Sequence, residues 1–169
     1  TLDEIDEAVR TARQAGCKDL TLLKCTSSYP ASPVYSNLMT IPHLAKTFGC
    51  NVGISDHTLG IGAALTAVAL GATVIEKHFT LNRSDGGIDS AFSLEPDELK
   101  LLVEESRRSC ESLGKVHFGP TEPERSSLVF RRSLYIVRDM KAGERLSAQN
   151  LRAIRPGNGL APKYLAQLL

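Results

Sequence analysis

The sequence predicts an α/β fold that is the C-terminal part of a (β/α)8 TIM barrel, followed by the start of a small β-rich module. Helical patterns alternate with short apolar runs over residues 1–114, and the connectors between them are short. Such alternation is typical of parallel βα units. A Gly- and Pro-containing segment, 115–132, then precedes a strand-like run at 133–137. We therefore expect part of a barrel at 1–114, a linker at 115–132 and a partial β module at 133–169.

The first element begins at Thr1, which forms an S/T-x-x-E capping box with Glu4, and its helix ends at Gly16. Apolar spacing and glycine stops predict the remaining elements of this region. They are a strand at 20–25, a helix at 38–48, a strand at 51–55, a helix at 61–70, a strand at 73–79, a polar loop at 82–93 and a helix from 96 to 113. Three strands cannot close a barrel, which takes roughly 250 residues.

Charge and composition exclude several classes of function. Twenty Lys and Arg residues against nineteen Asp and Glu give a net charge of +1, which argues against a nucleic-acid binder or a polybasic membrane segment. Only 5% of residues are aromatic and Trp is absent, so base stacking is not expected. The apolar stretch 59–75 is shorter than the ~20 residues of a spanning helix. The four cysteines form no C-x-x-C pair and no signal pattern opens the chain, which indicates a reducing, cytoplasmic setting.

The strand ends carry the residues that point to chemistry. Because alternate residues of a strand share a face, Ser55 and His57 lie together, as do Glu76 and His78, with Lys77 on the opposite side. If the strands are neighbours, these four side chains converge at the C-terminal mouth, where barrel enzymes place their sites. Two imidazoles beside a carboxylate suit a divalent metal with open positions. The alternative is that each His is a hydrogen-bonded core residue, but the matching parity favours a site.

Other candidates are weaker when taken from the residues alone. Ser27 and Tyr29 share a parity just past the first strand, but Tyr29 could equally pack on the barrel rim. Asp89 closes the Asp-Gly-Gly-Ile-Asp segment 85–89, which could be an ordinary turn. Arg155 lies in a Pro-Gly turn and could bind a carboxylate or remain a solvated surface residue.

Several strings together resemble the sialic acid synthase (nonulosonic acid synthase) family, in order along essentially the whole chain. They are LKCTSSYP (23–30), GISDHTLG (53–60), VIEKHFT (74–80), DGGIDS (85–90), SLEPDE (93–98) and IRPGNG (154–159). The resemblance implies a (β/α)8 barrel followed by an antifreeze-like (SAF) domain that reaches over the barrel of the partner in a domain-swapped homodimer. It also implies condensation of phosphoenolpyruvate with the open-chain aldehyde of an N-acylated amino sugar, with release of phosphate and a requirement for a divalent metal, Mn or Mg.

The resemblance further implies roles for eight positions. It assigns metal binding to His57 and His78, phosphoenolpyruvate binding to Ser27 and Ser55, contacts around the sugar to Tyr29, Glu76 and Asp89, and a contact across the dimer to Arg155. Proton transfer could fall to Glu76 or Asp89. Sialic acid synthases usually have Asn where Ser27 stands.

Within the family, CTSSYP and the Asp-Gly-Gly loop are most similar to the pseudaminic acid synthase branch, whose sugar is 2,4-diacetamido-2,4,6-trideoxy-L-altrose. The alternatives are N-acetylneuraminate or legionaminate synthesis, or a non-catalytic binding or assembly fragment. A barrel-type metal hydrolase fits the His pair but not the SAF-like tail. The family's early, lysine-bearing strands are not in this sequence, so we expect little turnover from this chain alone, and unpaired strand edges that favour association.

Overall fold

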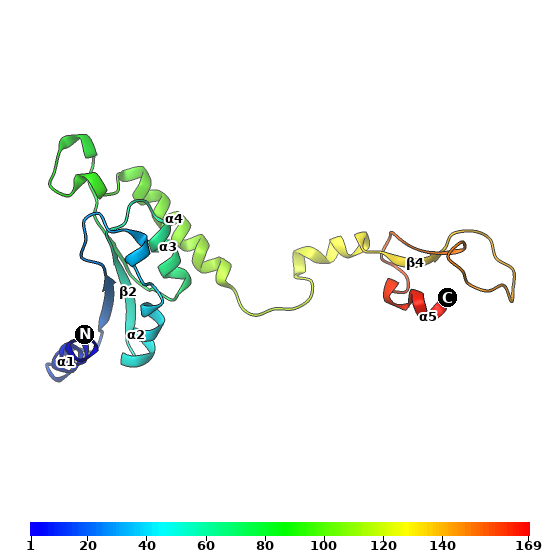
Figure 1. Cartoon of the computed structure of the whole chain (residues 1–169), viewed down its shortest axis with the longest axis horizontal. Coiled ribbons are helices and arrows are strands. Elements are labelled where there is room, and N and C mark those ends of the chain that lie inside the picture. Colours follow the sequence, from blue (N-terminus) through cyan, green and yellow to red (C-terminus); the bar gives the residue numbers. More distant parts are fainter. The chain divides into compact units, whose positions relative to one another are not determined.

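The computed structural model describes all 169 residues and divides into two compact units, Thr1–Lys115 and Val116–Leu169. The first unit alternates helices and strands (Figure 1). Its elements are α1 (Leu2–Gln14), β1 (Thr21–Cys25), α2 (Thr40–Phe48), β2 (Asn51–Asp56), α3 (Gly62–Ala69), β3 (Ile75–Lys77) and α4 (Pro96–Leu113). The predicted capping box is present at the start of α1, where Thr1 Oγ1 accepts from the backbone N–H of Glu4.

The three strands form one parallel sheet in the order β1-β2-β3. Thr21 pairs with Asn51 at the start of the β1–β2 ladder, and the β2–β3 ladder ends at Asp56 and Lys77. β3 is shorter than the predicted strand at 73–79. Pairing nevertheless continues before it, because the N–H of Thr73 donates to Val52 O at 2.9 Å.

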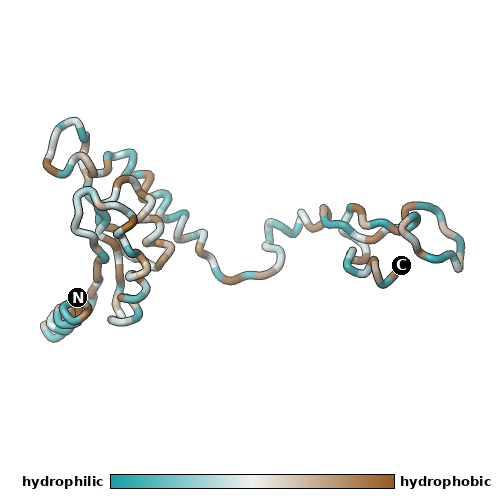
Figure 2. The backbone as a smooth tube through the Cα atoms, viewed as in Figure 1, coloured by the Kyte–Doolittle hydropathy of each residue, from teal (hydrophilic) through white to brown (hydrophobic).

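The core lies between one face of this sheet and the helices α1, α2 and α3. Ile41 of α2 is completely buried, and it packs with Val9 of α1 and with Val52 and Ile54 of β2. A second cluster joins α3 to α4 through Ala64, Leu94 and Leu102. In Figure 2 the exposed α1 is mostly hydrophilic, whereas hydrophobic positions recur through the middle of this unit.

The opposite face of the sheet is the one that the odd-numbered residues of β2 present. Gly53 lies there in very close contact with the strand beside it, since a Cβ at this position would be 2.3 Å from the backbone oxygen of Val74. Glycine therefore lets β2 and β3 approach, and Ser55 follows on the same face.

The second unit contains β4 (Ser133–Ile136) and β5 (Leu151–Ile154), which pair antiparallel, and the short α5 (Leu165–Leu168). The segment expected as a linker contains a 3₁₀ helix, Glu122–Phe130. Thr121 and Glu124 form a capping box at its start, the same local signal that begins α1.

The structure confirms the predicted α/β class, with three parallel βα units followed by a β-containing module. The sheet of the first unit is open, with β1 and β3 at its two edges. No helix in the chain has both the length and the apolar character that crossing a bilayer requires.

Candidate functional site

The strand ends of β2 and β3 bring Ser55 and Glu76 together, as the alternation predicted. They are paired positions of the ladder, and the Ser55 hydroxyl donates to Glu76 Oε1 at 2.6 Å. Ser55 is buried, whereas Glu76 is exposed. The hydroxyl therefore holds one carboxylate oxygen, and the carboxylate is left open to solvent and to a ligand.

His57 and His78 follow directly after these strands, and their ring centroids lie 5.1 Å apart. An open pocket of about 190 Å³ is lined by His57 and His78 together with Ser55, Glu76 and Lys77. The backbone of each histidine accepts a hydrogen bond from a residue elsewhere in the chain. Ala31 N–H donates to His57 O at 2.9 Å, and Leu94 N–H donates to His78 O at 2.8 Å.

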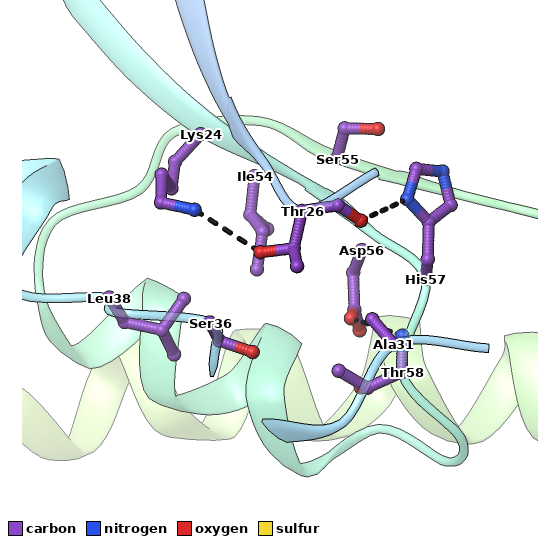
Figure 3. Close-up of a pocket in the computed structure, with 10 residues that line it drawn as sticks. All are labelled: Lys24, Thr26, Ala31, Ser36, Leu38, Ile54, Ser55, Asp56, His57 and Thr58. Atoms are coloured by element: carbon purple, nitrogen blue, oxygen red, sulfur yellow. Dashed lines mark hydrogen bonds between the residues drawn. The ribbon is translucent and has the colours of Figure 1, made fainter. Parts of the chain in front are cut away.

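The polar contacts of the two rings indicate which ring nitrogen is available to a ligand. His57 Nδ1 lies 3.0 Å from the carbonyl oxygen of Thr26 (Figure 3). A carbonyl can only accept, so Nδ1 is the donor of this bond and Nε2 is the nitrogen left for a ligand. His78 Nδ1 lies 3.6 Å from Asp89 Oδ2, which favours the same tautomer electrostatically.

This donor set fits a divalent metal. Metal-binding histidines commonly turn their other ring nitrogen toward a carbonyl or a carboxylate, as both do here. The chain has no group of three or more His, Cys, Asp or Glu side chains arranged to bind an ion. An ion held by these two imidazoles would therefore take its other ligands from oxygen atoms of substrate or water.

Tyr29 closes one side of this group. Its ring centroid is 4.3 Å from that of His57 and 6.1 Å from that of His78. Phe92 lies 5.0 Å from His78 and 5.8 Å from Tyr29. The aromatic residues thus form an apolar wall beside the two imidazoles, and Phe92 is a member of this wall that the sequence did not identify.

Asp89 is carried by the loop between β3 and α4. The base of this loop is fastened by Arg83, whose Nε donates to Ser93 O at 3.0 Å and whose guanidinium pairs with Glu95 and Glu98. The backbone N–H of Glu95 donates to Glu98, and this bond holds the pKa of that carboxyl below its ordinary value.

Ser27 is not part of this group. Ser27 is exposed, and its hydroxyl reaches the histidines only through Cys25, whose Sγ lies 3.8 Å from Ser27 Oγ and 3.9 Å from His57 Nδ1. Arg155 belongs to the second unit, where it is exposed directly after β5.

Two charged residues that the sequence analysis did not pair lie on the other face of the strands. Asp56 and Lys77 form a buried ion pair, with Lys77 Nζ 2.8 Å from Asp56 Oδ2. Figure 3 shows the Asp56 side chain pointing away from Ser55, toward Ala31 and Thr58. The position of Lys77 opposite Glu76 was predicted by alternation, but its partner was not.

Comparison with known proteins supports one family. A sequence model of the NeuB family matches residues 1–118, and one of the SAF domain matches residues 131–169. The chain is 41% identical over 169 residues to a pseudaminic acid synthase of Campylobacter jejuni, covering 100% of this chain and 49% of that protein. It is 42% identical over 171 residues to an N,N'-diacetyllegionaminic acid synthase of the same species, covering 99% of this chain and 51% of that protein.

A solved structure agrees. The N-acetylneuraminic acid (sialic acid) synthetase of Leptospira borgpetersenii, in complex with citrate, has a TM-score of 0.68 and 38% identity, over 76% of this chain and 45% of that chain. The chain spans about half the length of the curated relatives that it matches. With a family model matched over most of its length, the chain belongs to the NeuB family.

Proposed function

We propose that this chain is part of a nonulosonic acid synthase, a transferase that forms a carbon–carbon bond between phosphoenolpyruvate and the aldehyde of an N-acylated amino sugar. The observation that carries the proposal is the meeting of His57 and His78, with Ser55 and Glu76 beside them, at two adjacent strand ends. Membership of a family whose named relatives are synthases of such acids adds to this support.

His57 and His78 would bind the divalent metal, Mn²⁺ or Mg²⁺, through Nε2. When bound, such an ion supplies Lewis-acid polarisation of an aldehyde oxygen. The Nδ1 partners of the rings, Thr26 O and the Asp89 carboxylate, would hold both imidazoles in the orientation that this task needs.

The remaining residues divide between binding and proton transfer. The enol carbon of phosphoenolpyruvate forms a bond with the aldehyde carbon, water adds to C2, and the C2–oxygen bond to phosphate then breaks. Asp89, whose Oδ2 lies 3.6 Å from His78 Nδ1, and Glu76 carry carboxylates that would accept the proton of the water or donate one to the aldehyde oxygen. Tyr29, whose ring centroid is 4.3 Å from that of His57, would contact the sugar.

Phosphoenolpyruvate would be held by the hydroxyls of Ser27 and Ser55 at the ends of β1 and β2. Arg155 would act from the SAF-containing unit of a second copy in a domain-swapped homodimer, because a guanidinium in an exposed turn is suited to bidentate binding of a carboxylate or to hydroxyl groups. In this proposal the complete site requires two chains.

The amino sugar proposed is 2,4-diacetamido-2,4,6-trideoxy-L-altrose, and the product is pseudaminic acid. The motifs at 25–30 and 85–98 favour this branch. A legionaminic acid synthase is the second candidate, because a relative of that name is as similar to this chain as the pseudaminic acid synthase is.

The test is phosphate release from phosphoenolpyruvate by the full-length protein, with amino sugar present and with Mn²⁺ added or removed. We expect activity only with metal, and we expect His57→Ala and His78→Ala each to abolish it. His43→Ala is the matched control, since His43 is an exposed residue of α2, and it should retain full activity. Turnover that survives loss of either His57 or His78 would contradict the metal assignment.

A further inference from the structure

We infer that the buried Asp56–Lys77 pair is the positioning element of the candidate site: it fixes the spacing of His57 and His78 so that one metal ion can bind both. The inference rests on the proposed function for the identity of the ligand. It concerns two residues whose charged groups face away from Ser55 and Glu76. The Asp56 side chain points away from Ser55 (Figure 3), and Lys77 Nζ binds Asp56 Oδ2 and Thr58 O.

Lys77 holds both chain neighbours of His57. Its Nζ lies 2.8 Å from Asp56 Oδ2 and donates to the carbonyl oxygen of Thr58 at 2.6 Å. Asp56 Oδ1 accepts from the backbone N–H of Thr58 at 2.9 Å. The side chains of Lys77 and Asp56 are only 2% and 1% exposed. One ammonium group of β3 therefore holds the β2 chain immediately before and immediately after His57.

The backbone ladder alone does not reach the histidines. β2 and β3 pair at only three positions, Ile54 with Ile75, Ser55 with Glu76, and Asp56 with Lys77. His57 and His78 are the next residues of each chain, beyond the last pair. The side-chain bonds of Lys77 continue the connection between the strands past that point, so they control where one imidazole lies relative to the other.

The stability of the fold does not by itself explain why a charged pair is buried at this position. Burying two charges carries a desolvation cost, and apolar residues of similar volume are often as stabilising or more so. A charged pair in which Asp56 uses both oxygens and Lys77 uses two donors instead specifies direction and distance. That property is what a site built on two separate strand ends needs.

The test uses the full-length protein and two measurements, Mn²⁺ affinity by calorimetric or EPR titration and the midpoint of thermal unfolding. We expect Lys77→Met to lower Mn²⁺ affinity by about 10- to 100-fold, the usual effect of losing an outer partner of a metal site. Arg13→Met is the control, because the Arg13 guanidinium ties α1 to the end of α2 through Phe48 O at 2.6 Å, away from the histidines. It should bind Mn²⁺ as the wild type does, even if its midpoint falls.

A double variant distinguishes an effect on the positions of the histidines from an effect on folding stability. Asp56→Asn with Lys77→Met removes both charges and leaves an amide oxygen for the Thr58 N–H. We expect it to unfold at a higher temperature than Lys77→Met alone, since no unpaired charge is buried, and still to show the loss of Mn²⁺ affinity. A folded double variant that binds Mn²⁺ as tightly as the wild type would overturn the inference.

A measurement without metal distinguishes this inference from the proposed function. In the metal-free wild type we expect NMR contacts between the ring protons of His57 and His78, whose centroids are 5.1 Å apart, and we expect them to be lost in the double variant. If the wild type fails to bind Mn²⁺, the proposed metal site is wrong, and the ring contacts still decide on the positioning role. Their persistence in the folded double variant would refute it.

Discussion

Replacing Gly53 with alanine tests how closely β2 and β3 must approach to form the site. A Cβ at this position would lie 2.3 Å from the carbonyl oxygen of Val74, 2.9 Å from Val74 Cβ and 2.7 Å from Leu23 Cδ2. The leucine side chain can rotate away, but the backbone of Val74 can move only if the strand segment moves. The added methyl group should therefore push the β3 side of the sheet away from β2.

The size of the effect follows from that displacement. The Val74 oxygen must move from 2.3 Å to at least 3.4 Å to reach ordinary contact. That oxygen accepts the Ile54 N–H at 2.9 Å, and a shift of this size takes the bond out of range. A lost hydrogen bond of about 1 kcal/mol and overpacking of about 1–3 kcal/mol together lower the free energy of unfolding by about 2–4 kcal/mol.

The assay is equilibrium unfolding in urea of the full-length protein, with Gly62→Ala as the control. Gly62 begins α3, and a Cβ there would meet no atom within 4 Å, so the same substitution should stabilise by about 0.4–1 kcal/mol. The two variants are thus expected to change the free energy of unfolding in opposite directions. A Gly53→Ala protein within about 0.5 kcal/mol of the wild type, the range of ordinary surface changes, would refute the reasoning.

Three further outcomes are expected. Ile41→Ala removes a completely buried side chain and should lower the free energy of unfolding by about 2–5 kcal/mol in the same urea assay. Because the folded-state pKa of Glu98 is lowered by the Glu95 N–H, its stabilising effect is complete above its ordinary pKa and is lost as the pH falls through the folded value. Glu98→Gln should therefore lose less stability than the wild type on acidification from about pH 5 to pH 3 in thermal unfolding. Tyr29→Ala should lower Mn²⁺ affinity in a calorimetric titration, because it removes the ring that packs beside His57. Tyr29→Phe keeps that ring and should bind Mn²⁺ as the wild type does. Equal Mn²⁺ affinity of Tyr29→Ala and Tyr29→Phe would show that the ring does not support His57.

Strand alternation predicted the central part of the site because it depends only on local backbone geometry. The period of two placed Ser55 with His57 and Glu76 with His78, and the structure places these side chains on one pocket. The same period placed Lys77 on the other side. Its partner Asp56 could not be predicted, because the pairing of Asp56 with Lys77 depends on the offset between two strands, and hydropathy does not specify that offset.

Sequence patterns predicted the positions of loop residues least well. From the residues alone, Asp89 belonged to a segment that could have been an ordinary turn. Its approach to His78, at 3.6 Å, depends on the loop folding back so that Leu94 N–H binds His78 O. The 3₁₀ helix after residue 121 had a local signal, the Thr121–Glu124 capping box, but the prolines around it made the segment look like a linker.

The measurement that tests the central claim most directly is metal-dependent phosphate release from phosphoenolpyruvate by the full-length protein, with two sugars offered side by side. These are 2,4-diacetamido-2,4,6-trideoxy-L-altrose and N-acetylmannosamine. The account predicts release with the altrose sugar in the presence of Mn²⁺ and none with N-acetylmannosamine. Release with N-acetylmannosamine alone would overturn the proposed sugar and leave the synthase chemistry in place. No release with either sugar, from a folded protein that binds Mn²⁺, would contradict the proposed pseudaminic acid synthase activity.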